Sequence, residues 1–485
     1  MNLSGLTGGQ YKPLSQNQIE TLHTAALSIL EKTGMTFEPG LEDVAELLGS
    51  NGATVDMENR IIRFSSEMIA EAVSKAPEKV VLYGRKEEND LHLTKDRVHL
   101  GTGGAAIKII DLDTGEIRPT TLKDLEMVTR LVDRLENIHF LVRPCIPTDI
   151  DKADYDINMY YACLSATAKH VMSGVNDEKG LADVINMASL VAGGRDRLKA
   201  RPFISVITSF AISPLKLCTQ STRIMREAVK EEIPVALSCA PMAGSTSPLT
   251  MAGTLAQLHA EQLAGIAICQ FTNPGAPILY GGIPGMANLK TMGYLGGAVE
   301  CGMMNAAVHQ LADYIKIPNY NSSGLTDSKI PDAQAGYEKT FTTLLAAMGG
   351  SNYTHHAAGM LESMLTIAHE QFVIDDEIIG SACKVLKGIN CDEEHLALDV
   401  IEEVGAGGNF MMSPHTMEHL YDEYFMGNGV TDQKSRSHWE KDGGLDIRDR
   451  ARNIARSILD ESSESYIPED IDMEIRKKFR ILLKR

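Results

Sequence analysis

The sequence predicts an α/β fold and, within that class, a (β/α)8 barrel, on three observations. Short β-rich runs alternate with amphipathic helices about eight times between residues 96 and 366. The repeated units span roughly 260 residues, the usual length of such a barrel. Several strands open with a proline directly after a helix, which ends the helix and starts an extended segment. A doubly wound open sheet is the alternative, because alternation alone does not show closure.

The first 95 residues are expected to form a helical cap that carries a β-ribbon. Apolar side chains at helical spacing predict helices over residues 17–32, 41–49 and 65–76. The runs 80–83 and 91–93 alternate as strands do and predict the ribbon.

Residues 96–366 are assigned to the barrel. The expected strands cover residues 99–109, 139–144, 170–174, 202–210, 234–240, 277–282, 318–322 and 352–357. The expected helices cover residues 122–135, 179–192, 215–230, 250–270, 294–312 and 335–347. An Asp-Thr-Gly turn within residues 111–116 predicts a small hairpin after the first strand.

Residues 367–485 are expected to form a C-terminal helical extension. Helical patterns cover residues 378–387, 395–404, 414–425 and 447–459.

Charge and cysteine usage exclude several classes of function. The net charge is −19, from 46 basic and 65 acidic residues, which disfavours nucleic acid or an anionic membrane as a partner. Eight scattered cysteines without a C-x-x-C pair fit a reduced, cytoplasmic protein. Neither a signal peptide nor an apolar run long enough to span a bilayer is visible in the sequence.

Two short motifs match known patterns in their letters but not in their context. Residues 101–106 spell G-x-G-x-x-A, yet the run continues as a strand, whereas a dinucleotide site needs a helix there. Residues 415–419 spell the inverted zinc-peptidase motif H-x-x-E-H without a recognisable third ligand. Structural histidines are the simpler interpretation of the second motif.

A zinc–thiolate centre is a further alternative. Cys145 and Cys239 lie near strand ends, as do His355 and His356, so the four could converge in a barrel. Scattered buried cysteines are common core residues, however, and no metal site is expected.

Polar and aromatic residues gather where the predicted strands end. Residues 317–360 contain two consecutive strand–loop–helix units with such endings. In a barrel the carboxyl ends of all strands meet at one mouth, where (β/α)8 enzymes hold their substrates. The candidate residues are Arg143, Phe210, Tyr280, Gly281, Gly282, Asn321, Gly324, Asp327, Tyr353, His355 and His356.

This set is compatible with a cage for a cation. Phe210, Tyr280 and Tyr353 could surround a quaternary ammonium by cation–π attraction, worth about 0.5–2 kcal/mol per face. Arg143 could hold a carboxylate on the same ligand. The glycines could leave an opening for a planar cofactor. Alternatively, the aromatic side chains are barrel core, Arg143 pairs with an internal acid, and the glycines serve close packing.

The strings at residues 322–339 (SSGLTDSKIPDAQAGYEK), 349–363 (GGSNYTHHAAGMLES) and 434–453 (KSRSHWEKDGGLDIRDRARN) resemble the trimethylamine methyltransferase family, in its branch without pyrrolysine. The resemblance extends along nearly the whole chain. It implies a (β/α)8 barrel that transfers a methyl group from a methylated amine to Co(I) of a separate corrinoid protein. It further implies no tightly bound cofactor, and a homo-oligomer.

The expected roles follow from that resemblance and from the strand-end constellation. Asp327 and His355 are expected to be catalytic by orienting the substrate. The expected substrate-binding residues are Arg143, Phe210, Tyr280, Asn321, Tyr353 and His356. Gly281, Gly282 and Gly324 are expected to face the corrinoid.

One departure from the family pattern bears on the substrate. Founding members carry pyrrolysine in the loop after the seventh strand, which here falls near residues 332–334, and this chain has only standard residues there. The resemblance therefore implies a quaternary amine, such as glycine betaine, proline betaine or carnitine, in place of trimethylamine. A quaternary amine leaves as a neutral amine without a general acid, so positioning does most of the catalysis. The alternatives are a non-catalytic binder of small cations and a zinc-dependent methyltransferase.

Overall fold

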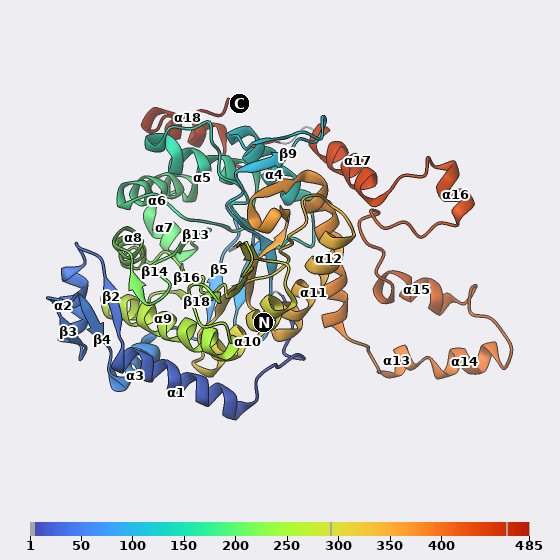
Figure 1. Cartoon of the computed structure of the whole chain (residues 1–485). Helices are drawn as coiled ribbons and strands as arrows, with labels where there is room; N and C mark the ends of the chain where they lie inside the picture. The colour runs from blue at the N-terminus through green and yellow to red at the C-terminus, as the bar shows by residue number, and fades with distance from the viewer. Residues whose placement is uncertain (1–4, 292, 462–463, 485) are drawn as a thin grey trace.

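The centre of the protein is a closed barrel of eight parallel strands (Figure 1). The computed structural model describes residues 5–291, 293–461 and 464–484. In spatial order the ring runs β11, β12, β13, β16, β18, β21, β22, β8. The strands are β8 (Leu100–Thr102), β11 (Leu141–Val142), β12 (Val171–Ser173), β13 (Ile204–Thr208), β16 (Val235–Cys239), β18 (Ile278–Gly282), β21 (Asn319–Ser322) and β22 (Tyr353–Ala358).

Hydrogen bonds between β8 and residues 139–142, in and just before β11, bring the two ends of the sheet together. The amide of His139 donates to the carbonyl of Leu100 at 2.9 Å, and the Thr102 hydroxyl donates to the carbonyl of Val142 at 2.6 Å. The predicted (β/α)8 barrel is confirmed. The open-sheet alternative is wrong, because no edge is left between the first and second strands.

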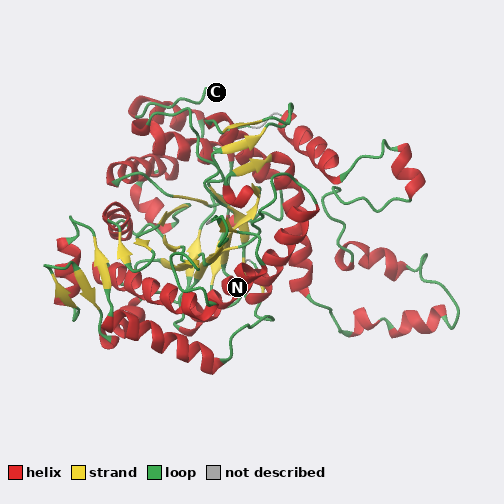
Figure 2. Cartoon of the chain, in the orientation of Figure 1, coloured by secondary structure: helices red, strands yellow, loops and turns green. Residues whose placement is uncertain are grey.

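One helix follows each strand and covers the outside of the barrel (Figure 2). These helices are α4 (Leu122–Arg134), α5 (Tyr155–Ala166), α6 (Glu178–Ala192), α8 (Thr219–Lys230), α9 (Met251–Thr272), α10 (Val299–Tyr314), α11 (Ala333–Gly349) and α12 (His369–Lys387). A short helix α7 (Arg195–Ala200) extends α6. The last barrel helix lies beyond residue 366, so barrel elements continue past the expected boundary. Among the described residues, no helix is both long and apolar enough to cross a membrane.

The N-terminal cap packs against the barrel through α9. Its helices α1 (Gln16–Lys32) and α3 (Ser66–Lys75) both contact α9, and α2 (Glu42–Ser50) joins them. These three helices confirm the sequence prediction. The cap also contains the strands β2 (Met35–Phe37), β3 (Thr54–Asp56) and β4 (Ile61–Arg63), which form one sheet with β14 (Ala211–Ile212) and β15 (Lys216–Leu217).

A β-hairpin fills the barrel floor at the amino ends of the strands. It consists of β5 (Val80–Leu82) and β6 (Leu91–Leu93), which pair antiparallel and confirm the predicted ribbon. Apolar side chains of this hairpin cluster with Phe140, Tyr320 and Tyr353 inside the ring. The lower half of the barrel is therefore mainly apolar core, with a buried polar pair, His170 and Ser205, at 2.7 Å.

Short strands lie over the opposite end, because they follow the carboxyl ends of barrel strands. One group is β17 (Met242–Ala243), β19 (Gly285–Ala287) and β20 (Tyr294–Leu295). The other is β9 (Lys108–Ile110), β10 (Ile117–Pro119), β23 (Met360–Leu361) and β24 (Thr366–Ala368). The predicted hairpin is confirmed as β9–β10. The single expected strand over residues 99–109 is wrong, because Gly104, at φ +124°, turns the chain between β8 and β9.

The C-terminal part contains helices that pack on the barrel and a segment that extends away from it. Helix α17 (Ile447–Asp460) packs on α12 and α4, and α18 (Glu469–Lys478) packs on α6. Between α12 and α17, the chain leaves the body with α13 (Glu393–Leu396), α14 (Leu398–Val404), α15 (Pro414–Glu423) and α16 (Arg436–Lys441) (Figure 1). The strands β1 (Leu6–Thr7) and β7 (Arg97–Val98) pair near the start of the barrel.

We expect Leu82→Ala, in the floor of the barrel, to lower the free energy of unfolding by about 2–5 kcal/mol, because the side chain is fully buried in the interior cluster. Denaturant unfolding measures this change. The matched control is Leu289→Ala, whose side chain is 57% exposed. Equal and small losses in the two variants would show that the hairpin does not complete the core.

Candidate active site

Polar side chains face the barrel interior directly above the apolar floor. Strand alternation points Tyr320 and Ser322 of β21 inward, together with Tyr353 and His355 of β22. A hydroxyl from the neighbouring β16, that of Ser238, lies beside the Tyr320 hydroxyl. The site is thus built mainly by β21 and β22, which are the seventh and eighth barrel strands along the chain.

His355 lies in the middle of this layer and is 2% exposed. Its Nδ1 is 2.8 Å from the hydroxyl of Tyr320, while its Nε2 is buried and has no hydrogen-bond partner in the described structure. Burial, and then the adjacent His356, hold the pKa of His355 well below its ordinary value, so the ring is neutral. A tyrosine hydroxyl that donates to Nδ1 leaves the imidazole proton on Nε2, available to a ligand.

The next residue, His356, enters the same layer through an irregular backbone. Strand alternation would turn it outward, but its φ is +64° and the pairing of β22 with β8 shifts register here. Its ring centroid is 3.6 Å from that of His355, and its Nδ1 is 2.8 Å from the Ser322 hydroxyl. Burial, and then the charge of Lys339, lower the pKa of His356 to about 3. Two neutral imidazoles therefore lie side by side inside the barrel.

A buried ion pair supports the segments that carry these histidines. Lys339 of α11 and Asp375 of α12 are both fully buried, with Nζ 3.2 Å from Oδ2. The ammonium also donates to the carbonyls of Gly324 and Met360, and Asp375 accepts the amide of Gly359 at 2.6 Å. The pair thus joins the loop after β21 to the chain after β22.

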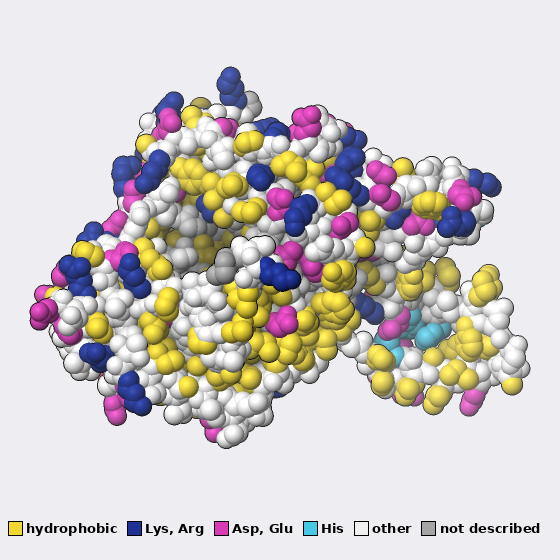
Figure 3. Space-filling view, viewed as in Figure 1, with side chains coloured by type: hydrophobic (Ala, Val, Ile, Leu, Met, Phe, Trp, Pro, Cys, Tyr) yellow, Lys and Arg dark blue, Asp and Glu magenta, His cyan; other side chains and the backbone are white. Residues whose placement is uncertain are grey.

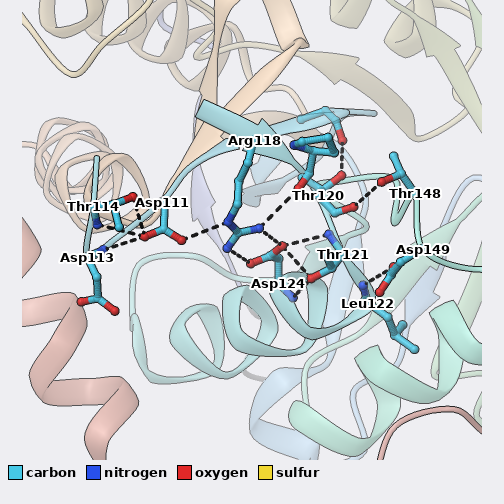
Figure 4. A network of polar contacts seen from close by, with 12 residues as sticks. Asp111, Asp113, Thr114, Arg118, Thr120, Thr121, Leu122, Asp124, Thr148 and Asp149 are labelled. Carbon is cyan, nitrogen blue, oxygen red and sulfur yellow. Dashed lines mark hydrogen bonds and ion pairs between the residues drawn. The ribbon is translucent and has the colours of Figure 1, made fainter. Parts of the chain in front are cut away.

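Outside the barrel, a second polar network anchors the hairpin over the mouth (Figure 4). Arg118 of β10 makes a bidentate pair with Asp124 at the start of α4, at 2.7 and 2.8 Å, and its Nε reaches Asp111 at 3.0 Å. Amide donation from Thr114, and then the Arg118 guanidinium, lower the pKa of Asp111 to about 2. These bonds fix the position of β9–β10 above the strand ends.

Three of the expected substrate-binding residues lie on the helix side of the barrel wall. Phe210 packs against α9 at Gly265, and the Tyr280 hydroxyl is 2.8 Å from Nδ1 of His259 on the same helix. The amide of Asn321 donates to a carbonyl of α10 at 2.9 Å. Tyr353 does face inward, but it stacks on Phe140 in the floor, with ring centroids 3.6 Å apart. The expected aromatic cage therefore does not form.

Arg143 and Asp327 occupy the rim rather than the interior layer. Arg143 points toward α5, where its Nη1 is 3.3 Å from the Tyr155 hydroxyl, and its Nε is buried without a partner. Asp327 accepts the amide of Gly296 at 3.2 Å and the hydroxyl of Ser363. It therefore joins the loops that follow three strands, and no contact between it and His355 is present.

The expected cofactor-binding glycines divide between the two faces of the wall. Gly281 faces inward beside the Tyr320 ring, whereas Gly282 faces Leu258 of α9 and Val308 of α10. Gly324, at φ +66°, lies against the backbone of Ala357, so a side chain there would collide with β22. Close packing explains Gly282 and Gly324.

The zinc alternatives find no support in the geometry. Among the described residues, no group of three or more histidine, cysteine, aspartate or glutamate side chains is arranged to hold a metal ion. Cys239 lies toward Glu261 of α9, away from His355, and burial raises the pKa of its thiol well above the ordinary value. His415 and His419 lie on α15, outside the barrel.

Sequence reasoning missed Tyr320, Ser322, Lys339 and Asp375. Strand alternation in β21 could have identified two of them, because Tyr320 and Ser322 flank Asn321 in the sequence and therefore share the face opposite to it. The ion pair gave no local signal, because its members belong to two helices and meet only in the folded chain.

Together, a closed (β/α)8 barrel and a neutral polar layer at the carboxyl ends of its strands define an enzyme-type site in a barrel of this class. The family model for trimethylamine methyltransferase (MTTB) matches residues 5–481. The chain therefore belongs to the trimethylamine methyltransferase family, which confirms the resemblance seen in the sequence.

Curated relatives match nearly the whole chain. The chain is similar to trimethylamine methyltransferase MttB of Desulfitobacterium hafniense, with 35% identity over 95% of this chain and 92% of that protein. It is also similar to a glycine betaine methyltransferase of the same species, with 31% identity over 98% of this chain and 97% of that protein. A solved structure, the monomethylamine methyltransferase of Methanosarcina barkeri, aligns with a TM-score of 0.48 at 12% identity, covering 94% and 95% of the two chains.

The pKa of His356 predicts a dependence of stability on pH. Because its folded pKa of about 3 lies below the ordinary 6.5, the unfolded chain takes up the proton first as pH falls. Its contribution to stability is complete above pH 6.5 and is lost as pH falls toward 3. We expect His356→Asn to reduce the loss of unfolding free energy between pH 7.5 and 5.5 by about 1 kcal/mol. Denaturant unfolding at both pH values measures it, with the exposed His438→Asn as the control that keeps the wild-type dependence.

The buried ion pair predicts a non-additive effect on stability. Lys339→Met leaves the Asp375 carboxylate buried without its partner and should cost about 3–5 kcal/mol of unfolding free energy. Lys339→Met combined with Asp375→Leu should recover much of that loss, because neither charge then remains buried alone. Chemical denaturation of the three proteins provides the comparison. A single-variant loss below about 1 kcal/mol would contradict the role of the pair.

Proposed function

We propose that this protein is a methyltransferase that moves a methyl group from a quaternary amine of the betaine type to Co(I) of a separate corrinoid protein. Family membership supports methyl transfer from a methylated amine. The observation that carries the choice of substrate is the neutral imidazole pair of His355 and His356 inside the barrel.

The loop after β21 supports a quaternary rather than a tertiary amine. The residues where the founding members carry pyrrolysine begin a helix here. The Asp332 carboxylate caps α11 by accepting the amide of Ala335 at 3.0 Å, and Gln334 donates to Glu338 at 2.9 Å. These side chains supply no electrophile that activates a tertiary amine. The 31% identical relative is named a glycine betaine methyltransferase, which fits this class of substrate.

The charge of the site suits a reaction in which the substrate loses its positive charge. A strongly anionic pocket would bind the starting cation more tightly than the transition state and would slow the transfer. In the structure, the imidazoles contact the hydroxyls of Tyr320 and Ser322, and the buried carboxylate of Asp375 is paired with Lys339. A site of low net charge positions the cation without trapping it.

The proposed step balances without a general acid. The nucleophilic Co(I) supplies the electron pair of the new bond to carbon, the C–N bond breaks, and its electron pair stays on nitrogen. The amine leaves neutral and the cobalt becomes methyl-Co(III). The residues of this chain orient the substrate and exclude water. The Nε2 of His355 is buried without a hydrogen-bond partner, and in the tautomer that carries the proton there it would donate to the carboxylate of a betaine.

Purified protein mixed with a reduced corrinoid protein and a panel of betaines tests the proposal through the loss of Co(I) absorbance. We expect transfer with at least one quaternary amine and none with trimethylamine. His355→Gln should lower kcat/KM at least tenfold, because it removes the neutral imidazole beside the substrate. His438→Gln on α16, an exposed histidine outside the site, serves as the matched control.

Two results would contradict the proposal. One is tight binding of a betaine with no methyl transfer, which would make the protein a binder of small cations. The other is a His355→Gln variant as active as the wild type, which would remove the imidazole layer from the reaction.

A further inference from the structure

We infer that the segment of residues 388–424, here called the arm, packs on a second copy of this chain and covers an apolar groove between its helices α11 and α12. The arm contains α13, α14 and α15 and extends away from the barrel (Figure 1). The inference concerns assembly, and only the choice of a second copy over a corrinoid protein rests on the proposed function.

The arm has no hydrophobic core of its own. Every residue from 388 to 424 is described, and none of them is buried. Several large apolar side chains are instead strongly exposed: Ile389 is 89% exposed, Met411 77%, Met412 91% and Tyr421 76%. Its helices have 4, 7 and 10 residues, which is below the about 12–15 residues that an isolated helix needs in water. A surface from elsewhere must stabilise this conformation.

The body presents a matching apolar surface beside the base of the arm. A groove of about 570 Å³ lies between α11 and α12, where Tyr337 is 54% exposed, Phe341 56% and Val385 51%. Figure 3 shows apolar side chains both on the arm and on the neighbouring face of the body. Each copy thus carries one apolar projection and one apolar recess, so a two-fold arrangement can cover both in both copies.

The negative charge of the arm limits the kinds of partner that it can contact. Between residues 388 and 424 the arm has nine acidic residues and no lysine or arginine. Nucleic acid and an anionic membrane surface are therefore excluded, because both would be repelled. A protein partner remains, and its contact must be permanent, since an apolar arm that is free most of the time promotes aggregation. A second copy is always present, whereas a corrinoid protein that shuttles methyl groups leaves after each turnover.

The size of the arm is sufficient for a stable contact. A standard protein interface has about 20–30 residues on each side and buries about 1,600 Å² in total. The arm supplies 37 residues from each copy, from residue 388 to residue 424. Two reciprocal arms therefore supply enough residues for a stable dimer.

Analytical ultracentrifugation of the full-length protein and three variants tests the inference. The wild type should sediment as a dimer or a larger closed assembly of the 52.8 kDa chain. An arm variant, Met411→Glu with Met412→Glu, and a groove variant, Phe341→Glu, should each shift to monomer at a concentration at which the wild type stays assembled. The control is Met57→Glu, an exposed methionine of the N-terminal cap, which should sediment as the wild type does.

Mixing the arm variant with the groove variant gives the sharpest readout. A mixed pair retains one intact contact, between the unaltered arm of one chain and the unaltered groove of the other. We expect the 1:1 mixture to assemble more strongly than either variant alone. Hydrogen exchange of the wild type provides a second measure, because arm amides should become more protected as protein concentration rises.

The inference is overturned by a monomeric wild type, by variants that assemble as the wild type does, or by monomeric variants that do not recover on mixing. Arm protection that is independent of concentration would show that the arm folds onto its own chain, and would equally overturn it.

Discussion

In a closed barrel, each strand can send only alternate side chains to the interior, and this constraint decides what the site contains. On β21 and β22 it selects Tyr320, Ser322, Tyr353 and His355. The floor hairpin makes the lower part mainly apolar, and the polar side chains of β21 and β22 lie in one layer above it, beneath the mouth. His356 is the exception, and its left-handed backbone lets two consecutive histidines share that layer.

The polar layer is held by groups outside the interior. The Lys339–Asp375 pair lies between α11 and α12 and fixes the backbone after β21 and after β22. A buried pair of this kind is costly to form and more costly to break, which makes it a specific constraint on geometry. Burial keeps His356 uncharged, and the charge of Lys339 adds to that effect. The pair therefore fixes the backbone of the site and contributes to its charge state.

The sequence was sufficient for the barrel, the floor hairpin and the N-terminal helices, because each is encoded by local periodicity. It also singled out His355 and His356, whose rings share one layer of the barrel interior. It did not show that Phe210, Tyr280 and Asn321 face the surrounding helices. The end of a strand indicates how high a residue lies in the barrel, but not whether its side chain points to the interior or to the helices. The arm could not be recognised either: its residues have helical patterns, and only the folded chain shows that they lack a core.

We propose that a permanently cationic nitrogen binds inside the barrel, beside the neutral imidazoles. The most direct test is a crystal structure of the protein with the quaternary amine that the activity panel selects. We expect the methylated nitrogen above Tyr320 and within contact of His355, with the ligand's methyl groups directed toward the mouth. A ligand bound outside the ring of strands, with His355 hydrogen-bonded to protein groups alone, would contradict it.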